Sequence, residues 1–125
     1  MEYKFGTLMQ VDLRKAWKHE AFDFTQWVAS REGIDLLGEA VGIDIDIDSI
    51  QKEAKAGCFR VDILAKESNT TRKIIIENQL AGSDHKHLGQ TIAYGSAHNA
   101  DIHIWIARDF RDEHQAAIRY LNERC

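Results

Sequence analysis

The stretch that most constrains this chain is the run of three isoleucines at 74–76, which leads directly into Glu-Asn-Gln at 77–79. Consecutive β-branched apolar residues are typical of a strand buried on both faces, so we expect a strand over residues 73–80 inside a sheet. A carboxylate at the end of such a strand is costly unless it has a partner. Glu77 is therefore either part of a structural ion pair or a functional carboxylate.

The composition predicts one compact domain over residues 1–125. No linker rich in proline, glycine or serine interrupts the chain, and 44% hydrophobic and 29% charged residues are ordinary for a soluble globular protein. We find no secretion signal, and no apolar run near the ~20 residues of a membrane span. The two cysteines, Cys58 and Cys125, form no disulfide framework, which favours a cytoplasmic protein, and Cys58 is expected to be a small buried residue.

The net charge of −4 argues against a domain that grips nucleic acid by bulk electrostatics alone. Bound divalent cations restore positive charge locally, where a phosphate would lie. A metal site could therefore compensate for the negative net charge where a nucleic acid binds.

The N-terminal part of the chain predicts mainly helices. Residues 7–13 indicate a short peripheral strand or an extended arm. Apolar residues recur every three or four positions over 17–42, which predicts two helices, the first capped by Asp23 or Thr25. We expect Gly33 to separate the helices and Gly42 to end the second.

Isoleucine and aspartate alternate over residues 43–48, which predicts a half-exposed strand with an acidic outer face. The alternation superficially resembles a calcium loop. A loop of that kind starting at Asp44 would need glycine and glutamate where Ser49 and Lys55 stand, so we exclude it.

A hairpin is predicted to bring two carboxylates together. Residues 59–65 form an alternating strand, and the polar segment 66–72 is typical of a turn that leads into the strand at 73–80. A turn centred near residues 69 and 70 places Asp62 opposite Glu77 on the adjacent strand.

After the hairpin we expect a helix over 84–97 capped by Ser83 or Asp84, a strand over 101–107 and a helix over 112–123. The whole order implies an α/β fold with a mixed sheet flanked by helices. The helix that follows Glu77 carries one polar stripe at intervals of three and four residues: His87, Gln90 and Tyr94.

The other histidines carry weaker signals. His85 and His87 are two residues apart on a helix and point to different faces, so a shared zinc site is not expected. His103 is expected to be a core histidine, and His98 and His114 to be surface or capping residues.

Asp62 and Glu77 on paired strands suit a hard cation such as Mg²⁺ or Mn²⁺, which prefers oxygen ligands. Such an ion polarises a phosphodiester and lowers the pKa of a bound water. His87 is the better placed of the neighbouring histidines to contact a phosphate or a water.

These residues resemble the PD-(D/E)xK nuclease superfamily. Asp62 and the Glu-Asn-Gln at 77–79 are similar to its strand motifs, and Gln90-Thr-Ile-Ala-Tyr94 is similar to the QxxxY helix motif of its RecB-like branch. A group of uncharacterised bacterial proteins of predicted nuclease type is also similar, and there a second domain often follows this one. The resemblance implies a restriction-endonuclease-like core.

The resemblance also implies roles for individual residues. Asp62 and Glu77 would bind the metal, with the main-chain carbonyl of Asn78 as a possible further ligand. Gln79 takes the catalytic place where the superfamily usually has lysine, so it hydrogen-bonds water without bringing a positive charge. A third metal ligand on a preceding helix is expected at Glu39, with Glu32 second. The substrate-binding residues would be His87, Gln90 and Tyr94.

Each of these residues also has a purely structural interpretation, as follows. Glu77 pairs with Lys73 or Arg60, Gln79 is an ordinary strand-end amide, Gln90 faces solvent and Tyr94 fills the core.

The sequence therefore supports two alternative hypotheses of function. The first is a nuclease that uses Mg²⁺ or Mn²⁺ to hydrolyse DNA. A homodimer would let it cut both strands, and in a longer protein a second domain would supply DNA affinity. The alternative, favoured by Gln79 and the charge of −4, is a catalytically inactive nuclease-fold module that binds nucleic acid or a partner protein.

Overall fold

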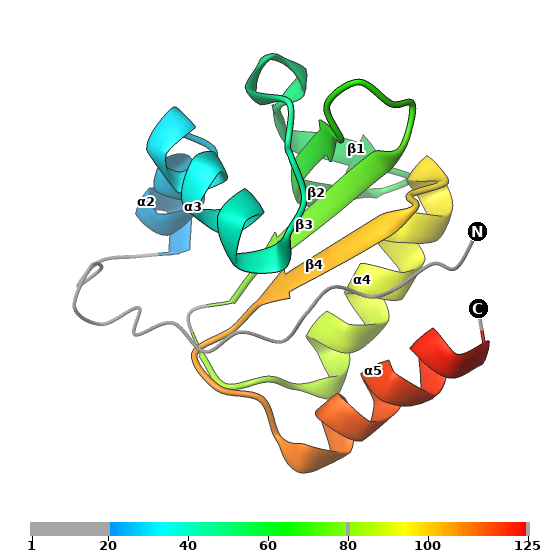
Figure 1. Ribbon diagram of the computed structural model, residues 1–125. Coiled ribbons are helices and arrows are strands. Elements are labelled where there is room, and N and C mark those ends of the chain that lie inside the picture. The colour runs from blue at the N-terminus through cyan, green and yellow to red at the C-terminus, as the bar shows by residue number, and fades with distance from the viewer. Residues whose placement is uncertain (1–20, 80, 125) are drawn as a thin grey trace.

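The computed structural model describes residues 21–79 and 81–124 (Figure 1). The arm or strand expected at residues 7–13 and the start of the helical region at 17 lie outside these ranges. The side chains of residues 21–23, Ala56 and Phe59 are likewise outside the description.

Four strands form one mixed sheet, and three of them lie where the sequence predicted a strand. They are β1 (Gln51–Ala56), β2 (Phe59–Lys66), β3 (Lys73–Asn78) and β4 (Ile102–Ile106), in the spatial order β1-β2-β3-β4. The first two pairings are antiparallel and the third, between β3 and β4, is parallel. The isoleucine run is therefore the centre of an inner strand.

Helices cover both faces of this sheet (Figure 1). The helices α2 (Ala21–Val28) and α3 (Arg31–Val41) precede it, α4 (His85–His98) connects β3 to β4, and α5 (Asp112–Arg124) ends the described chain. The pair α2 and α3 lies on one side and α4 on the other, which confirms the expected mixed sheet flanked by helices.

The isoleucine run contributes to two separate cores, which is why all three residues are apolar. Ile74 and Ile76 join the larger cluster, which includes Phe24 from α2 and Ile34 from α3. Ile75 points the other way and packs in a smaller cluster that includes residues of β2 and α4. All three isoleucines are fully buried, so the predicted strand with two apolar faces is correct.

The strand predicted at 43–48 is wrong. Ile45 makes only an isolated bridge to Glu67, and Asp46 caps a short 3₁₀ helix, η1 (Ile47–Ser49). The actual first strand is β1, whose sequence is mostly polar and exposed because it forms the edge of the sheet. The isoleucines of 43–48 still reach the larger core, but from a loop.

The predicted boundary between the two N-terminal helices is also wrong. Ser30, not Gly33, separates them, and its side chain accepts a hydrogen bond from the Gly33 N–H at 3.2 Å. Gly33 instead allows close packing, because a Cβ there would lie 2.2 Å from the carbonyl oxygen of Trp27. Thr25 lies inside α2 and is not its cap. Gly42 ends α3 as predicted, with a φ of 73°.

Cys58 is exposed, which contradicts the expected buried position. It lies between β1 and β2, in the tight turn that begins at Gly57. Within the described ranges, no helix is both long enough and apolar enough to span a membrane.

Candidate active site

The pairing of β2 with β3 places Asp62 beside Glu77, as the turn position predicted. The ladder sets Ile63 opposite Ile76, so Asp62 and Glu77 are the next residues along the two strands. Glu77 Oε1 accepts a hydrogen bond from the Asp62 N–H at 3.3 Å, and Asp62 Oδ2 accepts one from the Asn78 N–H at 2.9 Å. Each carboxyl group thus takes a backbone N–H of the opposite strand.

The electrostatics of this pair are unusual for a sheet interior. Glu77 is 3% exposed, and burial, reinforced by the charge of Asp62, raises the pKa of the Glu77 carboxyl to about 8. Burial also raises the pKa of Asp62, while the Asn78 N–H acts to lower it. Two neighbouring carboxyl groups cannot both ionise cheaply, so the charge on Asp62 opposes ionisation of Glu77.

No lysine or arginine of the described chain forms an ion pair with either carboxyl group. Arg60, one of the partners considered for Glu77, contacts Glu53 instead, at 3.8 Å. The structural ion pair is therefore not the reason for the buried carboxylate. Two carboxyl groups without a cation are a donor set that a hard divalent ion would satisfy, which fits the expected metal.

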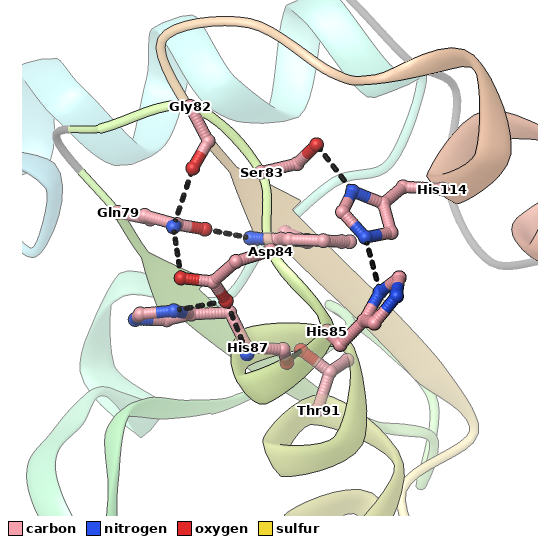
Figure 2. A network of polar contacts seen from close by, with 9 residues as sticks. Gln79, Gly82, Ser83, Asp84, His85, His87, Thr91 and His114 are labelled. Atoms are coloured by element: carbon pink, nitrogen blue, oxygen red, sulfur yellow. Dashed lines mark hydrogen bonds and ion pairs between the residues drawn. The ribbon is translucent and has the colours of Figure 1, made fainter.

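Gln79 is held by three hydrogen bonds (Figure 2). Its Nε2 donates to the carbonyl oxygen of Gly82 at 2.6 Å and to Asp84 Oδ2 at 3.0 Å, and its Oε1 accepts from Trp105 Nε1 at 3.0 Å. The side chain is 5% exposed. Its amide therefore ties together the end of β3, strand β4 and the loop that leads into α4.

Asp84 caps α4 as predicted, and it also contacts a histidine side chain. Its Oδ1 accepts from the His87 N–H at 2.7 Å and contacts His87 Nδ1 at 2.8 Å. The hydrogen bond from the His87 N–H holds the pKa of Asp84 below its usual value. The ionised carboxylate fixes the first turn of α4 and the imidazole together.

The three residues of the predicted polar stripe on α4 differ in exposure, because Tyr94 is buried while His87 and Gln90 are partly exposed. Tyr94 is buried and packs with Val61 and Ile75, so its ring fills the smaller core, as the structural alternative holds. Burial, and then the charges of Glu77 and Asp62, raise the pKa of the Tyr94 hydroxyl, which places it in the field of the carboxylate pair. Gln90 is half-buried on the same helix.

The structure does not bring Glu39 to the carboxylate pair. Glu39 is exposed on α3 and lines a separate cavity of about 250 Å³ together with Asp35 and Asp44. Over residues 21–79 and 81–124, no three side chains from histidine, cysteine, aspartate and glutamate gather closely enough to hold a metal ion. Glu32, the second choice, is also exposed, in the first turn of α3.

A second polar network was missed at the sequence level. His114, expected to be a surface or capping residue, is 1% exposed and lies inside α5, so that expectation is wrong. Its Nδ1 lies 2.6 Å from Ser83 Oγ and its Nε2 lies 2.7 Å from His85 Nδ1 (Figure 2). The one signal was that His114 precedes the apolar Ile118 by four residues, on the face of α5 that is buried. His103, in contrast, is packed as expected, with Nδ1 at 3.1 Å from the Thr91 carbonyl oxygen.

Comparison with known proteins identifies the fold. No family model matches this chain, and the search of curated proteins finds no match. Among solved structures, a repair endonuclease from Pyrococcus abyssi superposes with a TM-score of 0.64 over 83% of this chain, at 9% sequence identity.

The chain has a restriction-endonuclease-like fold. It covers 44% of the length of that endonuclease, so it corresponds to less than half of the larger protein. At 9% identity the likeness concerns the fold, and the chemistry must be argued from the residues of this chain.

Proposed function

We propose that this chain is a metal-dependent nuclease domain that hydrolyses phosphodiester bonds of DNA at Asp62 and Glu77. The observation that carries the proposal is the pair formed by buried Glu77 and partly exposed Asp62, which are joined across β2 and β3 and have no cationic partner in the described chain. Burying two acidic groups side by side is unfavourable, and an oxygen-liganded cation removes the cost.

Asp62 and Glu77 would hold Mg²⁺ or Mn²⁺, with the main-chain carbonyl of Asn78 as a further ligand. The bound ion would supply Lewis acidity toward a phosphodiester oxygen and make a coordinated water more acidic. Glu39 remains a proposed third ligand that would have to approach the pair on metal or substrate binding, since α3 holds it elsewhere in this structure.

Substrate contacts are assigned to the face of α4 near the pair. Gln90 and Tyr94 support the finer assignment to the RecB-like branch, whose helix motif they match, and Tyr94 lies in the field of both carboxyl groups. A DNA strand lying along this face would meet His87 and Gln90, which are both partly exposed. A dimer would place two such sites on a duplex.

Purified protein should cleave DNA only when Mg²⁺ or Mn²⁺ is added, and EDTA should stop it. Asp62→Ala and Glu77→Ala should each lower the rate by about 100-fold or more, because each removes a proposed ligand. Asp48→Ala, which removes an exposed carboxylate of η1, is the matched control and should keep the wild-type rate. Undiminished cleavage by both site variants would overturn the proposal.

A second candidate, the inactive module, is supported by Gln79. Both N–H donors of its amide are used inside the fold, by Gly82 and Asp84, and its oxygen accepts from Trp105, so the amide cannot donate to a water as the usual lysine would. Isothermal titration calorimetry separates the candidates. Absence of Mn²⁺ binding at millimolar metal, with the fold intact by circular dichroism, would favour the inactive module.

A further inference from the structure

The orientation of the Gln79 amide is determined by its partners. Trp105 Nε1 can only donate, so it must face the amide oxygen. The Gly82 carbonyl and the Asp84 carboxylate can only accept, so they must face the amide nitrogen. A flipped amide would oppose like groups at all three contacts. Gln79 is thus a rigid support for Asp84 Oδ2.

Asp84, held in place by Gln79, in turn fixes the orientation of the His87 ring. Its Oδ2 is taken by Gln79, while its Oδ1 faces both the backbone N–H and Nδ1 of His87. An ionised carboxylate only accepts hydrogen bonds, so Nδ1 of His87 must carry the proton (Figure 2). In the neutral imidazole this leaves an unprotonated lone pair on Nε2.

The lone pair on His87 Nε2 is free to accept a proton from a water. His87 Nε2 makes no hydrogen bond to any residue of the described chain, and the side chain is 25% exposed, so a substrate water has access to it. The ring lies within electrostatic range of Asp62 on β2, since a positive charge on His87 acts to lower the pKa of that carboxyl group against the opposing effect of burial. Asp84 is the carboxylate in direct contact with the imidazole.

We propose that His87 is the general base of the hydrolysis, that Asp84 holds it in the Nδ1–H tautomer, and that Gln79 is the positioning residue for Asp84. This inference rests on the proposed nuclease function. The attacking water gives one proton to His87 Nε2 as its oxygen forms the new bond to phosphorus. The bond from phosphorus to the leaving oxygen breaks with its electron pair, and that oxygen takes a proton from solvent. The imidazolium is stabilised by Asp84 until it releases its proton to solvent.

The first test removes the base. His87→Ala should lower kcat by about 100-fold or more, and should change KM much less, because the base acts in the transition state whereas its contact with DNA is one of several. Added imidazole should restore part of the rate, and the acidic limb of the pH–rate profile should be lost. His98→Ala, a histidine at the other end of α4, is the matched control and should keep the wild-type rate and profile.

The second test weakens the contacts that orient the His87 ring. Asparagine is as good a helix cap as aspartate, so Asp84→Asn should keep α4 folded. Capping keeps the amide oxygen toward the His87 N–H and Nδ1, so the NH₂ group opposes Gln79 Nε2 and that contact is lost. A neutral amide oxygen is a weaker acceptor than a carboxylate, so nitrogen-15 NMR of the His87 ring should show the Nδ1–H tautomer in the wild type and a larger share of the Nε2–H tautomer in Asp84→Asn. Gln79→Ala should shift the ring signals in the same direction and lower kcat.

The outcomes separate this inference from the function on which it rests. If wild type cleaves and Asp62→Ala does not, but His87→Ala keeps full rate and an unchanged pH profile, the general base is overturned and the nuclease stands. An Nε2–H tautomer of His87 in the wild type also overturns it. If the wild type does not cleave DNA with any added metal, both proposals fail.

Discussion

Glu77 is the residue whose pKa is raised most clearly by the fold. Its usual pKa of 4.5 rises to about 8 in the native protein, because burial and the adjacent Asp62 disfavour its charged form. Below pH 4.5 the group is protonated in both the folded and the unfolded chain and costs nothing. Between pH 4.5 and about 8 the unfolded chain loses the proton and the folded one keeps it, so native stability falls as pH rises.

Glu77→Gln should therefore stabilise the metal-free protein, and more so at high pH. The amide keeps a donor for Asp62 but cannot ionise. We expect a gain on the order of 4 kcal/mol at pH 8 and little gain at pH 4.5, measured by urea unfolding in EDTA. A difference between variant and wild type that does not change across this range would contradict the raised pKa of Glu77.

At the scale of elements, α4 lies so close to β4 that a side chain at one position would clash with a strand residue. A Cβ on Gly95 would lie 1.9 Å from the ring of His103, whereas a Cβ on Gly89, earlier in the same helix, would meet nothing within 4 Å. The two glycines therefore have opposite roles. Gly95 permits helix–strand contact, and Gly89 only weakens the helix.

Gly95→Ala should destabilise the protein by about 1–3 kcal/mol, because either the helix or His103 must move. Gly89→Ala is the matched control on the same helix and should stabilise it by up to about 1 kcal/mol through helix propensity. Thermal unfolding of the two variants compares them directly. Equal effects of the same sign would contradict the close approach of α4 to β4.

At the scale of the whole molecule, a metal ion that binds only the folded chain should raise its melting temperature. At a concentration tenfold above the dissociation constant the gain is about 1.4 kcal/mol, or a few degrees. Mn²⁺ should produce this shift in the wild type and in Asp48→Ala, and not in Asp62→Ala. A shift that persists in Asp62→Ala would place the metal away from the carboxylate pair.

Predictions from the sequence were most reliable where periodicity and turn position decide the structure. The isoleucine run led to an inner strand, the alternation of 59–65 and the polar turn led to the hairpin, and the register of Asp62 with Glu77 followed from the turn centre. The edge strand β1 was missed because an exposed edge needs no apolar alternation, and residues 43–48 misled because isoleucines can fill a core from a loop.

The sequence by itself determined that Asp62 and Glu77 would lie side by side, because antiparallel pairing converts spacing along the chain into contact across strands. Only the tertiary structure decided what surrounds them. The absence of a cation beside the pair in the described chain, the three bonds that hold Gln79, and the burial of His114 each depend on groups distant in sequence, drawn from β4, α5 and the loop before α4. No local pattern encodes which of those groups meet, because their distances are set by how helices pack on the sheet.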